Sequence, residues 1–198
     1  VLAGWLALGF GLPVAAAAGL VLLVQVAVTG AMHEDGLSDT VDGLWGGHTR
    51  ERRLEIMRDS RTGSYGILAL IFGVGLRWIA VSGLLALAPG SVIAAAVLSR
   101  GFMPCVMAAL RHARSDGLAH RVGRASWATA VAALLLGLVL ALAVGGWVVL
   151  VPGLIAALAV AALALIARAK IGGQTGDILG ATQQVSEIVL LLGLLAMI

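Results

Sequence analysis

Long apolar stretches alternate with short polar ones along the chain. An α-helix needs roughly 20 apolar residues to cross a bilayer, so each long stretch predicts a transmembrane helix. We expect six such helices, at about 4–31, 66–87, 91–110, 125–145, 147–167 and 182–198. Two connections between them, around Pro89 and around Gly146, are short and uncharged, so each is expected to close a hairpin. The pattern therefore predicts an all-α, polytopic integral membrane helical bundle.

The three other connections, 32–65, 111–124 and 168–181, are polar. Each hairpin returns the chain to the side from which it came, so all three polar loops are expected on one face. They hold eleven of the 13 basic residues, namely Arg50, Arg52, Arg53, Arg58, Arg61, Arg111, Arg114, Arg121, Arg124, Arg168 and Lys170. By the positive-inside rule, this face is predicted to be cytoplasmic, with the chain in the cytoplasmic (inner) membrane.

Composition supports this class. Hydrophobic residues make up 61% of the chain and charged residues 12%. The net charge of +3 does not indicate nucleic-acid binding, because the charges lie in the polar loops. The one cysteine, Cys105, has no disulfide partner in the chain.

We expect a single membrane-embedded domain over 1–198. Its many glycines let helices approach closely, which favours self-association as a homo-oligomer.

The first polar loop begins with the stretch His33–Gly43, which is rich in carboxylates. On a helix, Asp35, Asp39 and Asp42 fall at i, i+4 and i+7, and would share one face. Clustered carboxylates repel one another unless a cation joins them, and Mg²⁺ prefers such oxygens together with substrate phosphates. We therefore predict a magnesium site here. The alternative is a solvated acidic face with no ligand.

The same loop continues with Arg58–Gly66, in which Arg58 and Arg61 flank Asp59. Two guanidiniums beside a carboxylate and near two glycines suit a phosphate held next to a metal ion. Arg50 and Arg52, in contrast, are expected to be positive-inside anchors only.

The third polar loop, Gly172–Ala181, combines glycines with Thr175 and Asp177 and precedes an apolar helix. A glycine-rich turn before a helix start suits a phosphate. Glu187 is expected about one and a half turns into that helix. A flexible turn is the alternative.

Four further ionisable residues are harder to assign from the pattern. His33 is either a hydrogen-bond donor to a carboxylate or an interfacial residue. Glu34 would point about 100° away from Asp35 on a helix, so it is a weaker candidate. Arg77 and Arg100 fall inside apolar spans, where a charge must face a polar interior. Arg100 is expected to reach the charged cavity, and Arg77 to be paired or to extend to the opposite surface.

Four motifs in this order resemble the cobalamin synthase family, also called adenosylcobinamide-GDP ribazoletransferases. They are His33–Gly43, Arg58–Gly66, Ala113-Arg114 with Asp116-Gly117-Leu118, and Gly172–Ala181 with Glu187. The resemblance covers essentially the whole chain. It departs at Glu34, where an apolar residue is expected, and at Val1, where the family's usual preceding segment is absent through truncation or disorder.

The resemblance implies a Mg²⁺-dependent enzyme of the cytoplasmic membrane. A hydroxyl of α-ribazole, or of its 5′-phosphate, would attack adenosylcobinamide-GDP at phosphorus, releasing GMP and forming cobalamin or its phosphate. On this hypothesis Mg²⁺ is held by Asp35, Asp39, Asp42 and Asp59. Phosphates are clamped by Arg58, Arg61 and Arg114, and the substrate also contacts His33, Arg100, Thr175 and Asp177. Asp42 is the expected proton acceptor.

Two other functions fit part of the pattern. CDP-alcohol phosphotransferases also carry two aspartates three residues apart followed by glycine, as Asp39, Asp42 and Gly43 do here. That family then expects an Ala-Arg pair, and Leu44-Trp45-Gly46-Gly47 stands in its place. An ion-coupled transporter would instead need ionisable residues at mid-membrane in several helices, whereas the acidic residues here gather toward one face.

Overall fold

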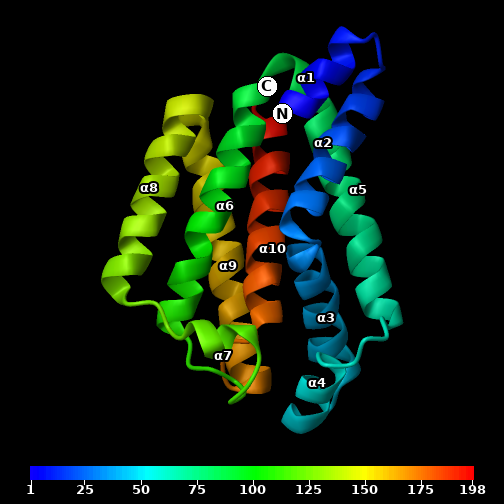
Figure 1. Ribbon diagram of the computed structural model, residues 1–198. Coiled ribbons are helices and arrows are strands. Elements are labelled where there is room, and N and C mark those ends of the chain that lie inside the picture. The colour runs from blue at the N-terminus through cyan, green and yellow to red at the C-terminus, as the bar shows by residue number, and fades with distance from the viewer.

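The computed structural model describes the backbone of residues 1–198 and every side chain except that of Leu118. The chain forms a helical bundle (Figure 1). In chain order the helices are α1 (Leu2–Gly9), α2 (Val14–Thr29), α3 (Met32–Gly46), α4 (Arg50–Ile56), α5 (Ser64–Leu87), α6 (Pro89–Ala109), α7 (Leu118–Val122), α8 (Trp127–Gly145), the short 3₁₀ helix η1 (Trp147–Val149), α9 (Leu150–Ile171) and α10 (Gly176–Leu195). The predicted all-α class is confirmed.

Five helices within the described residues are long and apolar enough to cross a membrane: α5, α6, α8, α9 together with η1, and α10. The pair α2 and α3 passes the same test jointly, but it is bent by 85°. The protein is thus an integral membrane protein. Both uncharged connections close hairpins as predicted, with Pro89 as the first residue of α6 and Gly146 at a positive φ of 71°.

The predicted first span, 4–31, is wrong as a single helix. Pro13 lacks an amide hydrogen, and Gly11 adopts a φ of +81°, so the chain turns between α1 and α2. A second break follows at Gly30 and Ala31, which both have positive φ. Hydropathy does not detect the first break, because every residue around it is apolar or small, whereas the second break coincides with the predicted end of the span at residue 31.

Helix α10 lies in the middle of the bundle (Figure 1) and packs against α3, α5, α6 and α9. It begins six residues earlier than the predicted 182–198, so Asp177 lies in its first turn. Glu187 accordingly stands about three turns inside the helix. The predicted third loop shrinks to the segment between Ile171 and Gly176, because α9 also continues through Arg168 and Lys170.

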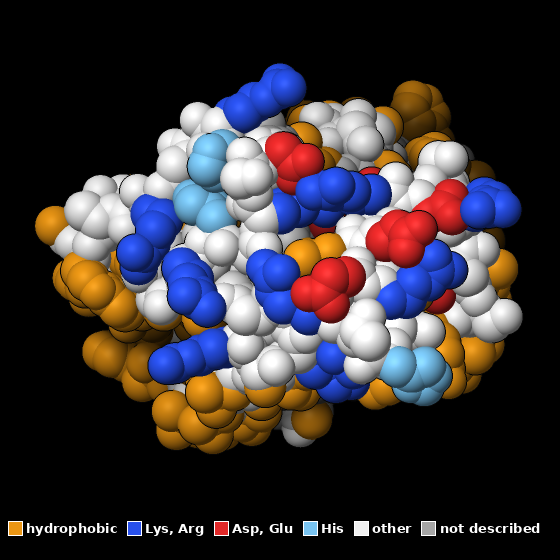
Figure 2. Space-filling model, turned by 90° about the horizontal axis from the view of Figure 1, so that it is seen from below, with side chains coloured by type: hydrophobic (Ala, Val, Ile, Leu, Met, Phe, Trp, Pro, Cys, Tyr) orange, Lys and Arg blue, Asp and Glu red, His pale blue; other side chains and the backbone are white. Residues whose placement is uncertain are grey.

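The first polar loop is mostly helical, since it contains α3 and α4, and the second contains α7. In Figure 1, α4 and α7 lie together at the lower end of the bundle, while both termini lie at the upper end. Seen from below, that lower end carries many blue and red side chains, which are Lys, Arg, Asp and Glu (Figure 2). The prediction that the three polar segments share one face is confirmed.

Helices α3 and α10 approach closely at two glycines. A Cβ on Gly180 would lie 3.0 Å from the Met32 carbonyl oxygen and 3.1 Å from the Gly36 Cα. A Cβ on Gly36 would in turn meet the Asp177 carbonyl oxygen at 2.9 Å. Backbone therefore packs on backbone here, and this contact brings the acidic residues of α3 beside the start of α10.

Candidate active site

The three polar segments are joined by a chain of ion pairs at the lower end of the bundle. Arg58, in the loop after α4, lies 2.7 Å from a carboxylate oxygen of Asp116, in the loop before α7. Asp116 also lies 3.7 Å from Arg114. Arg114 in turn lies 3.4 Å from Asp177 at the start of α10. Segments far apart in the sequence thus bring the predicted phosphate-binding arginines together. Asp116 links them, a function that its position in the sequence does not predict.

A group of carboxylates lies next to this chain. Asp35 is exposed and Asp39 half-buried, both on α3. The charges of Asp35, Asp177 and Asp42 act on Asp39, and Arg114 is the cation that offsets them in part. Asp177 also experiences the charge of Asp35. Clustering of these carboxylates was predicted, and the structure adds Asp177 to it.

Asp42 has a structural function that the sequence did not reveal. Its buried carboxylate accepts hydrogen bonds from the backbone amides of Gly63, at 2.7 Å, and Gly66, at 2.9 Å. These amides belong to the N-terminus of α5, so the negative charge of Asp42 caps that helix. A Cβ on Gly66 would strike the carboxylate of Asp42 and the hydroxyl of Ser38. The glycines of this motif therefore make room for the cap.

Asp59 lies on the surface, where it pairs with Arg61. The Arg61 guanidinium donates to both carboxylate oxygens, with the shortest contact at 2.8 Å, and the Arg61 backbone amide donates as well. The side-chain hydrogen bonds from Arg61 hold the pKa of Asp59 below its ordinary value. Both predicted functions, metal ligand and phosphate clamp, would require this pair to open.

Thr175 fixes the start of α10. Its buried hydroxyl accepts from the Ile178 amide, at 3.3 Å, and donates to Asp177 at 3.0 Å. It therefore caps the helix and orients the carboxylate. The preceding residue, Gln174, is also held by the segment that carries Arg114. Its backbone amide donates to the Arg111 carbonyl oxygen, and its carbonyl oxygen accepts from the Ala113 amide, both at 2.8 Å.

Arg50 is more than a positive-inside anchor, contrary to expectation. Its guanidinium donates to the carbonyl oxygens of Ile171, at 3.0 Å, and Ala113, at 2.5 Å. It therefore ties α4 to the end of α9 and to the segment that carries Arg114. Lys170 adds a second tie, because it donates to the Leu44 carbonyl oxygen of α3 at 2.7 Å. Both contacts fix the relative positions of the charged segments.

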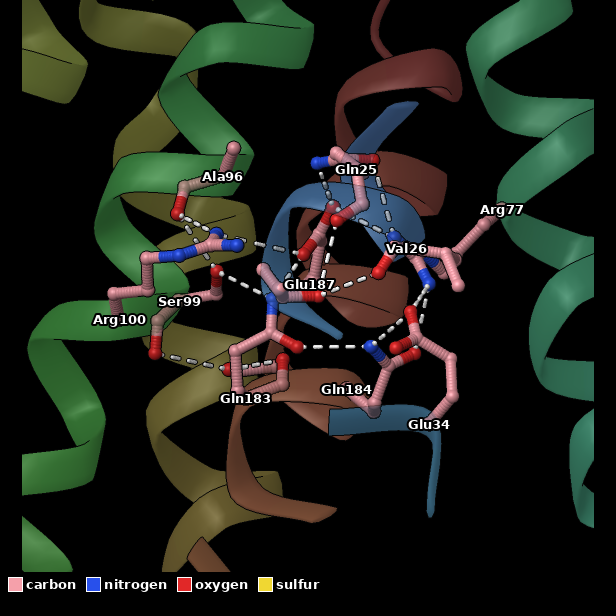
Figure 3. Close-up of polar contacts among 12 residues, drawn as sticks. Gln25, Val26, Glu34, Arg77, Ala96, Ser99, Arg100, Gln183, Gln184 and Glu187 are labelled. Atoms are coloured by element: carbon pink, nitrogen blue, oxygen red, sulfur yellow. Dashed lines mark hydrogen bonds and ion pairs between the residues drawn. The ribbon is translucent and has the colours of Figure 1, made fainter. Parts of the chain in front are cut away.

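A buried polar network lies further up the bundle (Figure 3). Arg77 of α5 is 2% exposed and donates to Glu34 at 2.6 Å, to Gln184 at 3.0 Å and to Gln25 at 3.1 Å. It also lies 3.5 Å from Glu187. Of the two expectations for Arg77, the paired one is confirmed. Glu34, a weak candidate in the sequence, is its main partner.

Arg100 joins this network from the side of α6. It lies 3.8 Å from Glu187 and donates to the Ala96 carbonyl oxygen at 2.6 Å. Glu187 also accepts from Gln183, which reaches Ser99 (Figure 3). Arg100 therefore belongs to the interior network. The expectation that acidic residues gather only at one face was wrong, because Glu34 and Glu187 are buried inside the bundle.

His33 lines an apolar cavity instead of contacting a carboxylate. The cavity measures about 190 Å³, and its walls include Met32, Met103, Met107 and Leu179. It lies between α3, α6, α7 and α10, next to the acidic group.

The carboxylate oxygens near Asp39 are the kind of ligand that hard cations such as Mg²⁺ prefer. Among the described side chains, however, no group of three or more His, Cys, Asp or Glu residues is arranged to hold a metal ion. The observation in favour of a cation is that the charges of Asp35 and Asp177 both act on Asp39 and that Arg114 offsets them only in part. Such a set fits Mg²⁺, which commonly takes one or two carboxylates and completes its shell with water and phosphate.

Comparison with known proteins gives consistent results. A family model described as "Cobalamin-5-phosphate synthase" matches residues 1–195. Proteins named adenosylcobinamide-GDP ribazoletransferase are similar along most of the chain. One from Bradyrhizobium diazoefficiens is 48% identical over 179 residues, which is 89% of this chain and 69% of that protein. One from Mesorhizobium japonicum is 44% identical, covering 92% of this chain and 71% of that protein. No solved structure matches.

Proposed function

This chain belongs to the cobalamin-5-phosphate synthase family, and we propose that it catalyses the late joining step of vitamin B12 biosynthesis. The adenosylcobinamide-phosphate part of adenosylcobinamide-GDP is transferred to α-ribazole or to its 5′-phosphate. The acceptor hydroxyl oxygen forms a bond to the phosphorus attached to cobinamide, the bond from that phosphorus to GMP breaks, and GMP leaves. Membership of this family replaces the two alternatives, the CDP-alcohol phosphotransferase and the transporter.

The observation that carries this proposal is the ion-pair chain from Arg58 through Asp116 and Arg114 to Asp177. Transfer between phosphates needs positive charge around the phosphoryl oxygens and the leaving group. Arg114 supplies a donor already in position, because its Nη1 is buried and has no hydrogen-bond partner among the described side chains. Arg58 and Arg61 are exposed in the loop after α4, and they would bind the outer phosphates after releasing their present carboxylate partners.

Mg²⁺ would be held by Asp35 and Asp177, together with oxygens of the substrate phosphates. When bound there, the ion would supply positive charge to the phosphoryl oxygens and to the leaving GMP. Asp42 and Asp59 are left out of the proposed site, because their carboxylate oxygens already accept hydrogen bonds from the α5 amides and from Arg61. Thr175 orients Asp177, so its function is positional.

Asp39 is the proposed proton acceptor in place of Asp42. It is half-buried and surrounded by other carboxylates, which favours its taking a proton from the acceptor hydroxyl. Asp42, in contrast, would have to give up its cap on α5 to do so.

The charged face is proposed to lie in the cytoplasm and the bundle in the inner membrane, on the basis of the positive-inside rule. Nucleotide and corrinoid substrates would then approach from the cytoplasm. Self-association is proposed on the basis of the glycine-rich spans.

The test measures GMP release by detergent-purified protein supplied with adenosylcobinamide-GDP and α-ribazole, with and without Mg²⁺. Wild-type protein is expected to release GMP and form cobalamin only with the metal. Asp39→Asn should reduce turnover by about 100-fold or more. Glu55→Gln is the matched control, because it makes the same chemical change on the same face at a residue paired only with Arg52. Equal loss in both variants, or undiminished turnover in Asp39→Asn, would refute the proposed base.

A further inference from the structure

A second basic site lies at the lower end of the bundle, apart from the acidic residues. It is a cavity of about 510 Å³ where α6 and α9 end. Its walls are Ala109, Leu110, Arg111, Arg124, Arg168 and Gly172. We call it the basic pocket. Figure 2 shows, on the left of the same face, blue side chains with no red ones among them.

The three arginines of the basic pocket differ from those of the candidate active site in their partners. Arg58, Arg61 and Arg114 all pair with carboxylates. Among the described side chains, Arg111, Arg124 and Arg168 form no ion pair. Arg111 donates to the Gly172 carbonyl oxygen at 3.0 Å and Arg124 to that of Ala108 at 2.5 Å. These contacts hold two guanidiniums in place without neutralising their charge.

The basic pocket lies at the level where apolar spans give way to polar segments. Helix α6 ends at Ala109, α9 ends at Ile171 and α8 begins at Trp127. Trp127 is 61% exposed, and the outer side of α8 continues with exposed apolar residues such as Leu135. Exposed tryptophan at the end of an apolar helix is typical of the headgroup region of a bilayer.

We propose that the basic pocket binds a phosphate group presented at the membrane surface, as in the headgroup of an anionic phospholipid. Guanidiniums bind phosphate oxygens in a fork geometry, and basic pockets between transmembrane helices on the cytoplasmic side bind anionic headgroups. The acyl chains of such a lipid would follow the apolar outer surface of α8. A nucleotide diphosphate carries the same chemistry, so the test must separate the two sources. None of this depends on the proposed enzymatic reaction.

The test compares lipid retention by the full chain in detergent, measured by native mass spectrometry. Phosphatidylglycerol is titrated against phosphatidylcholine, which has the same phosphate but no net charge. Wild-type protein is expected to retain phosphatidylglycerol preferentially. The double variant Arg124→Gln/Arg168→Gln should bind it about tenfold more weakly. The control Arg52→Gln/Arg121→Gln removes the same charge from the same face and should keep the preference.

Two further measurements make the result decisive. Arg168→Gln alone removes a guanidinium that donates no hydrogen bond among the described side chains, so a loss of preference in this variant is not due to misfolding. GDP binding, measured by equilibrium dialysis in phosphatidylcholine micelles, should be unaffected by the double variant. Equal loss in both double variants, or no loss in either, overturns the proposal. If GDP binding depends on Arg124 and Arg168 while lipid retention does not, the lipid headgroup is the wrong source.

Discussion

Arg77 donates a hydrogen bond of 2.6 Å to Glu34, and both side chains are buried inside an apolar bundle. The pair joins α5 to the first turn of α3, directly after the break that separates α3 from α2. Because Asp35 and Asp39 lie on the same helix, the pair fixes the position from which they reach the site.

Removing one member of this pair should be severely destabilising. Arg77→Gln leaves Glu34 and Glu187 buried with less positive charge nearby, so we expect the free energy of unfolding to fall by about 3–5 kcal/mol. The double variant Glu34→Gln/Arg77→Gln removes one charge of each sign and should recover part of this loss. Thermal unfolding in detergent is measured for Arg77→Gln, Glu34→Gln and the double variant. If the losses of the two single variants simply add in the double variant, the two residues are not coupled.

Asp42 and Asp39 should respond in opposite ways to the same substitution. Asp42→Asn loses the charged cap on α5, because an amide offers one acceptor oxygen in place of two. We expect a loss of about 1–2 kcal/mol in stability. Asp39→Asn removes a charge that neighbouring carboxylates repel, so its melting temperature should stay the same or rise. Changes in melting temperature that have the same sign and size in the two variants would contradict these two functions.

The contact between α3 and α10 should tolerate no side chain. Gly180→Ala places a methyl group against the backbone of Met32 and Gly36, and we expect a loss of about 1–3 kcal/mol with a parallel loss of GMP release. Gly75→Ala is the control, because nothing lies within 4 Å of its Cβ position on α5. That variant should be neutral or gain up to about 1 kcal/mol.

Magnesium should stabilise the protein as well as activate it. Binding to the folded state raises the melting temperature by mass action, so Mg²⁺ added after treatment with a chelator should raise it in the wild type. Asp177→Asn should reduce this shift, whereas Glu55→Gln should retain it. An equal shift in all three proteins would place the ion elsewhere.

The fold was largely predictable, because apolar stretches of membrane-spanning length leave few alternatives. The exceptions have a local cause. Positive φ at Gly11, followed by Pro13, breaks the first predicted span without any polar residue nearby. The start of α10 differs from the prediction because Gly176, Asp177 and Gly180 are residue types typical of turns, yet they lie in its first turns.

The sequence predicts which polar segments meet at the candidate site better than it predicts what each side chain does there. Its motifs lie in polar segments, and these meet at one end of the bundle. The use of Asp42 as a helix cap depends on a contact with residues more than twenty positions away, which no local pattern shows. The interior network did leave a signal: Gln25, Gln183 and Gln184 all stand within segments that are predicted to span the membrane.

The position of Glu187 on the last helix has a consequence for biogenesis. The chain is synthesised from its N-terminus, so Glu34 is already present when Arg77 leaves the ribosome, and these two can neutralise each other early. Arg100 and the side-chain amide nitrogen of Gln25 both contact Glu187, which is synthesised after them, so these two contacts form later. Helix α10 therefore inserts into a bundle in which part of the buried polar network still lacks its carboxylate. Its insertion completes this network and also brings Asp177 to the candidate active site.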